Sequence, residues 1–165
     1  MADDQKLGAV SALHWGVKQS FRGYVAMMGG VTEVDGGVEI AADGGFTFIA
    51  APDSDLRLGH DGVLTGQGRF LGSVRFEAHG GMLKVFLADP ALEINGTTAS
   101  LSVADRAART RRVEIARLDL SALVSGEDGE RVIPTSLSID GSFLLGDHYP
   151  PTTVLDPVRL TWPAA

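Results

Sequence analysis

The sequence has no cysteine, few basic residues and no long hydrophobic run. Without cysteine the chain can form no disulfide framework, no thiolate metal site and no cysteine nucleophile. No stretch approaches the roughly 18 consecutive apolar residues of a membrane-spanning helix. The acidic start, Met1 to Lys6, leads into no apolar run of signal-peptide length. These absences argue against a disulfide-stapled domain and against insertion into a membrane.

Positive charge is also scarce. Lys and Arg number 14 against 21 Asp and Glu, which gives a formal charge of -7. Because nucleic-acid binding needs a basic face that displaces phosphate counterions, this balance predicts no nucleic-acid partner. A hydrolase motif is missing as well, since Gly141-Ser142 lacks the flanking glycine of a nucleophile elbow.

Glycine, in contrast, is abundant. The 21 glycines among 165 residues are about twice the usual share, while hydrophobic residues make up an ordinary 44%. This combination is typical of a turn-dense β protein and not of a disordered chain. A chain of this length buries one sizeable core. We therefore predict a single domain over residues 1–165, with its core between about residues 11 and 162.

Alternating hydrophobic residues predict that most of the chain is β-strand. The predicted strands are Val31–Val34, Val38–Ala41, Phe46–Ala50, Phe70–Ala78, Leu83–Ala88, Ala99–Val103, Val113–Leu120, Leu137–Ile139 and Val158–Trp162. Dipeptides such as Asp43-Gly44 and Asn95-Gly96 supply the positive φ angles of tight hairpin turns between them. Strands spaced by about ten residues predict a mainly β fold, an antiparallel β-sandwich or barrel.

One short α-helix is predicted near the start of the chain. Ser11 can cap a helix that ends near Gly23, and its core face is formed by residues four apart, Leu13, Val17 and Phe21. A neighbouring face carries a second set with the same spacing, Gly16, Ser20 and Tyr24. The two small residues beneath the tyrosine would leave a shallow shelf, on which a flat ligand could lie.

Three segments of the chain resemble the HtaA domain, the haem-binding module of actinobacterial haem-uptake proteins. They are Trp15–Val25, Gly72–Leu83 and the closing stretch Gly141–Pro157, which together span nearly the whole chain. The first is the most specific, because its Trp, Gly, Lys, Ser, Phe, Arg and Tyr all follow the family's order. The resemblance implies that Tyr24 is the axial ligand of ferric haem b and that His79 hydrogen-bonds it.

The chemistry of a tyrosine–histidine pair agrees with that assignment. A phenol titrates near pH 10 in water, so binding iron as phenolate at neutral pH requires the metal charge and a hydrogen-bond donor, which His79 can provide. Ser20 and Phe21 are further candidates for contact with the porphyrin, although Phe21 serves the core equally well. Tyr149 falls where the family commonly has an aromatic residue, and its role stays open.

Three other histidines are possible iron ligands in principle. His14, His60 and His148 each lie in polar or turn-like sequence, where a solvated histidine is commoner. His148 is the strongest of the three, because it precedes Tyr149 in the closing segment of the resemblance.

The resemblance implies a haem-binding protein for transfer, buffering or storage and not an enzyme. Two alternatives stay open: a haem-dependent peroxidase or redox enzyme, and a β-domain without haem that mediates protein contact. The expected partners are haem and either another haem-carrier protein or a second copy of the chain. We expect a cytoplasmic carrier if the chain is complete, and a secreted or cell-surface domain if it is excised from a longer protein.

Overall fold

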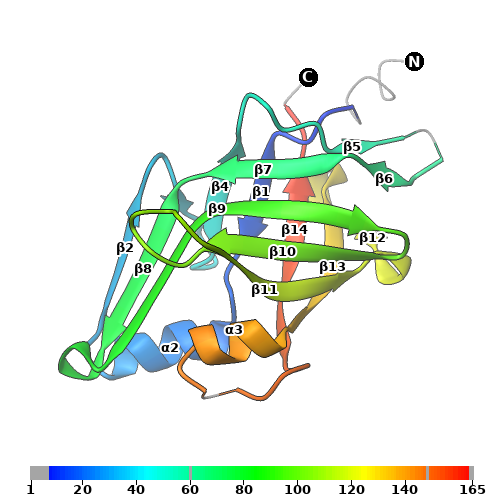
Figure 1. Cartoon of the computed structure of the whole chain (residues 1–165). Helices are drawn as coiled ribbons and strands as arrows, with labels where there is room; N and C mark the ends of the chain where they lie inside the picture. Colours follow the sequence, from blue (N-terminus) through cyan, green and yellow to red (C-terminus); the bar gives the residue numbers. More distant parts are fainter. Residues whose placement is uncertain (1–7, 60, 148, 164–165) are drawn as a thin grey trace.

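The computed structural model describes residues 8–59, 61–147 and 149–163. Eight strands form a closed antiparallel barrel, because β9 and β10 pair with each other and so close the ring (Figure 1). In order around the barrel these strands are β9 (Leu83–Asn95), β10 (Thr98–Ala104), β11 (Arg112–Asp119), β13 (Arg131–Leu137), β14 (Val154–Thr161), β1 (Ala12–Trp15), β4 (Phe46–Ala50) and β7 (Gln67–Leu71).

An arm of three strands projects from one end of this barrel. Strand β9 has 13 residues, more than the barrel uses, so its first half pairs with β8 (Ser73–Ala78) outside the barrel. The other edge of β8 pairs with β2 (Val31–Asp35). At the tip of the arm β8 turns into β9 through a short 3-10 helix, η1 (His79–Gly81).

The remaining elements are short. Helix α2 (Gln19–Met27) follows β1, and helix α3 (Ile139–Leu144) follows β13; both lie at the end of the barrel from which the arm projects (Figure 1). The other segments are β3 (Glu39–Ile40), β5 (Arg57–Leu58), β6 (Leu64–Thr65), β12 (Val124–Ser125), η2 (Leu120–Ala122) and η3 (Glu127–Gly129).

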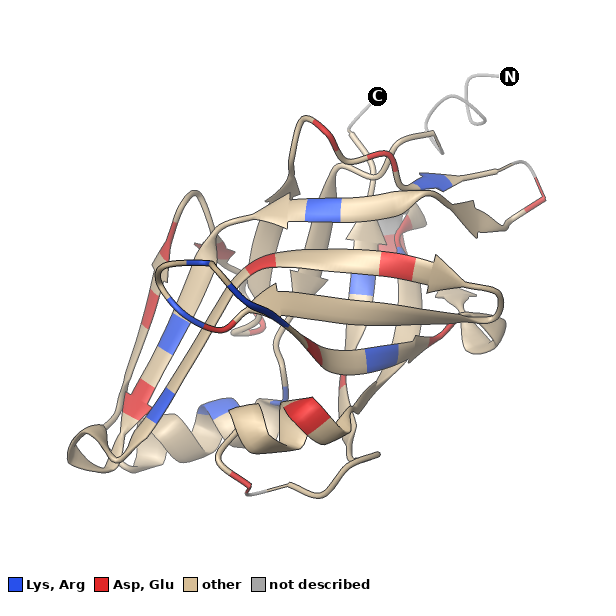
Figure 2. Ribbon diagram, in the orientation of Figure 1, with Lys and Arg blue, Asp and Glu red and all other residues tan. Residues whose placement is uncertain are grey.

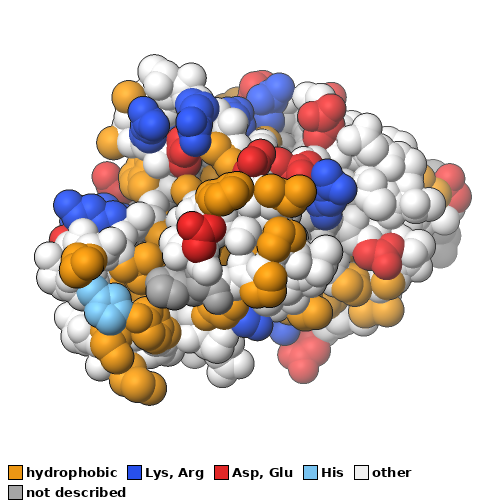
Figure 3. Space-filling view, turned by 60° about the horizontal axis from the view of Figure 1, so that its bottom comes forward, with side chains coloured by type: hydrophobic (Ala, Val, Ile, Leu, Met, Phe, Trp, Pro, Cys, Tyr) orange, Lys and Arg blue, Asp and Glu red, His pale blue; other side chains and the backbone are white. Residues whose placement is uncertain are grey.

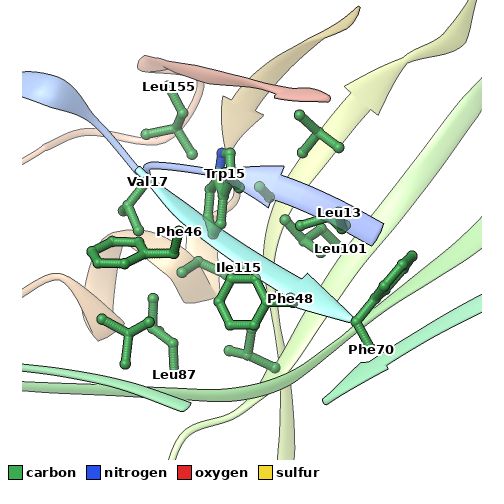
Figure 4. Packing of buried hydrophobic residues seen from close by; sticks show 14 of the residues in the cluster. Leu13, Trp15, Val17, Phe46, Phe48, Phe70, Leu87, Leu101, Ile115 and Leu155 are labelled. Carbon is green, nitrogen blue, oxygen red and sulfur yellow. The ribbon is translucent and has the colours of Figure 1, made fainter. Parts of the chain in front are cut away.

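Hydrophobic residues fill the barrel and continue beneath the arm. Inward-facing side chains alternate with exposed ones along β7, where Gly68 and Phe70 are buried and their neighbours are exposed. Figure 4 shows Leu13, Phe48 and Leu101 packed together inside the barrel. The strong strand periodicity of the sequence therefore reflects a real inner and outer face.

The predicted mainly β fold is confirmed, but the predicted start of the helix is wrong. Residues Ala12–Trp15 form strand β1, which pairs with β4 and β14, and the helix begins only at Gln19. Both faces of β1 are mostly buried, so its hydrophobic residues do not alternate with polar ones as in a half-exposed strand. Their spacing therefore resembled that of one face of a helix. The helix also continues past Gly23 to Met27.

The predicted strands near Leu137 and Phe70 need correction. Leu137 ends β13, and Ile139 begins helix α3. The predicted strand Phe70–Ala78 is two strands, β7 and β8, separated by Gly72 with φ 116°. This backbone conformation breaks the strand because only glycine adopts it readily.

Charged residues of both signs are distributed over the strands and loops (Figure 2). Basic residues are commonly paired with acidic ones, as Arg109 is with Asp89 at 3.0 Å and Arg111 with Asp105 at 2.9 Å. Among the described residues, no helix has the length and apolarity that would be needed to cross a bilayer.

Gly23 offers a test of how far helix α2 is optimised for stability. A β-carbon at this exposed helical position would meet no atom within 4 Å. We expect Gly23→Ala to raise the free energy of unfolding by about 0.5–1 kcal/mol, because glycine in a helix loses more backbone entropy on folding. Urea unfolding followed by circular dichroism measures this change.

Gly30, just after the same helix, is the matched control. There a β-carbon would lie 2.4 Å from the carbonyl oxygen of Glu77 and 2.8 Å from that of Val25. Gly30→Ala should therefore destabilise the protein. Stabilisation by both substitutions would show that the packing around α2 is looser than described.

Candidate functional site

Tyr24 and His79 meet at the tip of the arm, although 55 residues separate them in the sequence. Tyr24 Oη and His79 Nε2 share a hydrogen bond, and the centroids of the two rings lie 5.4 Å apart. In one tautomer of the imidazole the phenol donates to Nε2; in the other, Nε2–H donates to the phenol oxygen. Tyr24 is half-buried and His79 is exposed. The structure thus brings together the two residues to which the sequence assigned iron chemistry.

The turn after β8 places His79 over helix α2. His79, Gly80 and Gly81 have φ angles of 55°, 62° and 94°, so three consecutive residues have left-handed backbone. Glycine adopts this conformation without strain, and histidine does so more readily than β-branched residues. The chain can therefore reverse within three residues and present the imidazole at the end of the arm.

Helix α2 positions Tyr24 through its buried face. Phe21 and Val25 are both 1% exposed, and the ring of Phe21 packs edge-on against Phe76 of the arm with centroids 5.1 Å apart. Tyr24 lies between these two buried residues in sequence, at the boundary between the core and the surface. Phe21 therefore packs helix α2 onto the arm, and its ring is not exposed at the surface for contact with a ligand.

Three exposed methionines lie close in sequence to Tyr24 and His79. Met27 and Met28 follow Tyr24 on and just after α2, with exposures of 79% and 43%, and Met82 beside the His79 turn is 90% exposed. Figure 3 shows hydrophobic side chains gathered on this face of the molecule. The sequence prediction missed these residues, although methionines shortly after both Tyr24 and His79 could have indicated an apolar surface there. Their flexible, polarisable side chains suit an irregular apolar contact.

Ser20 and Tyr149 form the neighbouring part of the surface. Ser20 Oγ lies 3.5 Å from Tyr149 Oη, and the Phe21 and Tyr149 rings are 6.4 Å apart. Lys18 Nζ lies 5.7 Å from the centroid of the Tyr149 ring. The backbone of Tyr149 is anchored by a hydrogen bond of 2.5 Å from Ser142 Oγ of α3 to its carbonyl oxygen. The Ser20 hydroxyl thus lies one helical turn before Tyr24, next to the Tyr149 hydroxyl, and the Lys18 ammonium group, which also donates to the carbonyl oxygen of Val154 at 2.9 Å, lies by the Tyr149 ring.

Gly16 does not form the predicted shelf beneath Tyr24. It lies before the helix and is buried, and a β-carbon there would be 2.2 Å from Arg22 Nη1 and 2.6 Å from Asp156 Oδ2. A side chain at position 16 would therefore clash with Arg22 and Asp156. Ser20 alone of the two small residues lies on the helical surface near Tyr24.

His14 bonds to two threonines and lines a different part of the surface from the pair. Its Nδ1 lies 2.7 Å from Thr47 Oγ1 and its Nε2 3.3 Å from Thr161 Oγ1, and burial lowers the pKa of the imidazole. It lines a separate hollow of about 550 Å³, which reaches the other side of α2 at Gln19 and Arg22. His60 and His148, the other two candidates, lie outside the described residues.

The chain is thus a small antiparallel barrel with a projecting arm, in which a helix tyrosine and an arm histidine meet at the surface. Within the described ranges, no group of three or more His, Asp and Glu side chains is arranged to hold a bare metal ion.

The HtaA family model matches residues 10–161, and the chain belongs to this family. The solved C-terminal domain of HtaA from Corynebacterium glutamicum is 28% identical, with a TM-score of 0.71 over 94% of this chain and 98% of that domain. The N-terminal domain of the same protein is 22% identical, with a TM-score of 0.72 over 95% of this chain and 99% of that domain. No curated protein sequence matches significantly.

Two further solved structures from the same organism share the fold. The haem-binding protein HtaB is 20% identical, with a TM-score of 0.66 over 93% of this chain and 92% of that chain. A domain-swapped dimer of a histidine-to-alanine variant of the C-terminal domain of HtaA is 29% identical, with a TM-score of 0.61 over 88% of this chain and 90% of that chain.

Proposed function

We propose that this protein binds ferric haem b at the tip of the arm, with the Tyr24 phenolate oxygen as the axial ligand and His79 Nε2–H donating to it. The observation that supports this most directly is the hydrogen bond between Tyr24 Oη and His79 Nε2 at the surface. Membership of the HtaA family and the likeness to a haem-binding protein, HtaB, support the same ligand.

The residues around the pair fit a porphyrin. An anionic phenolate oxygen suits ferric iron, and a donor to that oxygen fixes its orientation and adjusts its basicity. A planar macrocycle also needs apolar contact, which exposed Met27 and Met82 offer on either side of the pair. Ser20, Tyr149 and Lys18 supply polar groups at one edge, suited to the carboxylates that a haem carries. Bound haem supplies the iron; the protein supplies the phenolate, its donor and the apolar contact.

The proposed role is carriage of haem and not turnover. A pair that lies on the surface leaves a bound planar ligand within reach of a second protein, as transfer requires. Another haem carrier or a second copy of this chain is the natural partner; a histidine-to-alanine variant of an HtaA domain forms a domain-swapped dimer.

Parallel titrations with ferric protoporphyrin IX and metal-free protoporphyrin IX test the proposal. We expect saturation at one ferric haem per chain, with an absorption spectrum of tyrosinate-ligated ferric iron. The metal-free ring retains the apolar contacts but cannot bond Tyr24, so it should bind at least about tenfold more weakly, a difference of about 1.4 kcal/mol. Equal affinity for the two rings would contradict ligation through iron.

A further inference from the structure

The first turn of helix α2 is capped by a residue from the far end of the chain. Lys18 occupies the N-cap position but makes no capping hydrogen bond with its side chain. Instead Asp156 Oδ1, 137 residues away in strand β14, accepts a hydrogen bond of 2.9 Å from the backbone N–H of Gln19. A carboxylate at this position satisfies an otherwise unpaired N–H and faces the positive end of the helix dipole.

The second oxygen of the same carboxylate holds the helix from the side. Asp156 Oδ2 accepts a hydrogen bond of 2.6 Å from Arg22 Nη1, and both side chains are largely buried, with exposures of 27% and 16%. Arg22 also donates to the carbonyl oxygen of Gly16 at 2.7 Å and to that of Asp43 at 3.2 Å. The charged group of Arg22 thus links the helix to the segments before and after it.

The backbone of Asp156 fixes the link between β1 and the helix. Its N–H donates to the carbonyl oxygen of Val17 at 2.9 Å, and its carbonyl oxygen accepts a hydrogen bond of 2.8 Å from Trp15 Nε1. Val17 has φ 65°, a rare conformation for a β-branched residue, which persists only where the surroundings enforce it. Asp156 helps to enforce it, because its N–H bonds to the carbonyl oxygen of Val17.

We propose that Asp156 is a positioning residue that determines where Tyr24 lies relative to His79. This inference rests on the proposed function, since it concerns the placement of the haem ligand. Helix α2 has only nine residues, and Tyr24 follows Gln19 by little more than one turn. A shift or rotation of the first turn is therefore carried directly to the Tyr24 phenol, whereas His79 is held independently by the arm.

Asp156→Ala and Asp156→Asn separate the two contributions of the carboxylate. Alanine removes both the cap and the partner of Arg22, whereas asparagine can still accept from the Gln19 N–H but carries no charge. Glu130→Ala is the matched control, because Glu130 lines the same hollow and pairs at 3.8 Å with Arg159 of β14 but not with α2.

Two measurements are needed, one of which does not depend on haem. In the ligand-free protein, Asp156→Ala should lower hydrogen-exchange protection of the α2 amides roughly tenfold, as loss of a helix cap does. It should also change the NMR signals of the His79 ring. In the haem-loaded protein, it should raise the haem dissociation rate about tenfold, the usual lower bound for removing a supporting partner of a metal ligand. For both the exchange protection and the haem dissociation rate, Asp156→Asn should give values between those of Asp156→Ala and wild type. Glu130→Ala should give wild-type values.

Unchanged α2 protection and unchanged His79 signals in Asp156→Ala would overturn the inference, as would equal effects of Glu130→Ala. If Asp156→Ala does not fold, Asp156→Asn decides: wild-type exchange and dissociation rates in that variant would overturn the role of the carboxylate charge. Failure of the wild-type protein to bind haem would refute the proposed function, while the exchange data would still test Asp156.

Discussion

Replacing Tyr24 with phenylalanine is expected to weaken ferric haem binding at least about a hundredfold and to abolish the tyrosinate spectrum. Removing a hydrogen-bond partner of a metal ligand typically costs 10- to 100-fold in affinity, and loss of the proposed ligand itself should cost at least the upper value. The fold should survive, because Tyr24 is half-buried and its hydroxyl bonds at the surface. Absorbance titration with ferric haem measures both the affinity and the ligation.

Tyr149→Phe is the matched control for this substitution. The chain has two tyrosines, and Tyr149 Oη lies next to Ser20 and not in the Tyr24–His79 pair. It should leave the tyrosinate spectrum intact and reduce the affinity only slightly. The ferric haem affinity of His79→Ala should lie between those of Tyr24→Phe and Tyr149→Phe. This variant should keep the tyrosinate spectrum but bind haem roughly tenfold more weakly than wild type. A Tyr24→Phe protein with the wild-type spectrum would exclude Tyr24 as the ligand.

Barrel strands such as β4, β10 and β11 could be predicted because two-residue periodicity records which side chains point inward. Phe46, Phe48 and Phe70 are buried in the positions that this alternation assigns to the core. The closure of the barrel could not be predicted, since it depends on which strands pair and not on local pattern. Nor could the arm, which arises because β9 continues beyond the barrel and pairs with β8.

The Tyr24–His79 pair was predicted through the resemblance of two segments to one family, and not through local structure. The local prediction placed a helix across Ala12–Trp15, where the chain forms a strand, and assigned Gly16 to a ligand shelf. Gly16 instead makes room for Arg22 and Asp156. No local signal marks Asp156 as a helix cap, because cap and helix are 137 residues apart. Long-range polar contacts of this kind become visible only in the folded chain.

The two halves of the site meet through the core beneath them. Helix α2 carries Tyr24 and the arm carries His79, so their hydrogen bond requires a fixed packing of helix against arm. That packing centres on Phe76 of β8, whose ring meets Phe21 of α2 at 5.1 Å and Phe46 of the barrel at 5.8 Å, both edge-on. Phe76 is 0% exposed. The same side chain thus joins the barrel, the arm and the helix.

Phe76→Ala should lower the free energy of unfolding by about 3–5 kcal/mol, the usual cost of deleting a large buried aromatic side chain. Against a total stability of about 5–15 kcal/mol for a typical protein, this loss is severe. It should also weaken haem binding by the folded molecules, because the cavity lies between the elements that carry Tyr24 and His79. Urea unfolding measures the first effect, and haem titration under conditions that keep the variant folded measures the second.

Phe70→Ala distinguishes a specific effect on the site from general loss of stability. Phe70 is 1% exposed in strand β7 of the barrel, which contacts neither α2 nor the tip of the arm through its strand pairing. It should cost a similar 3–5 kcal/mol but leave the haem affinity of the folded protein unchanged. If both variants lose the same affinity at equal stability, the packing of Phe76 has no special role, and the Tyr24–His79 geometry depends on overall stability alone.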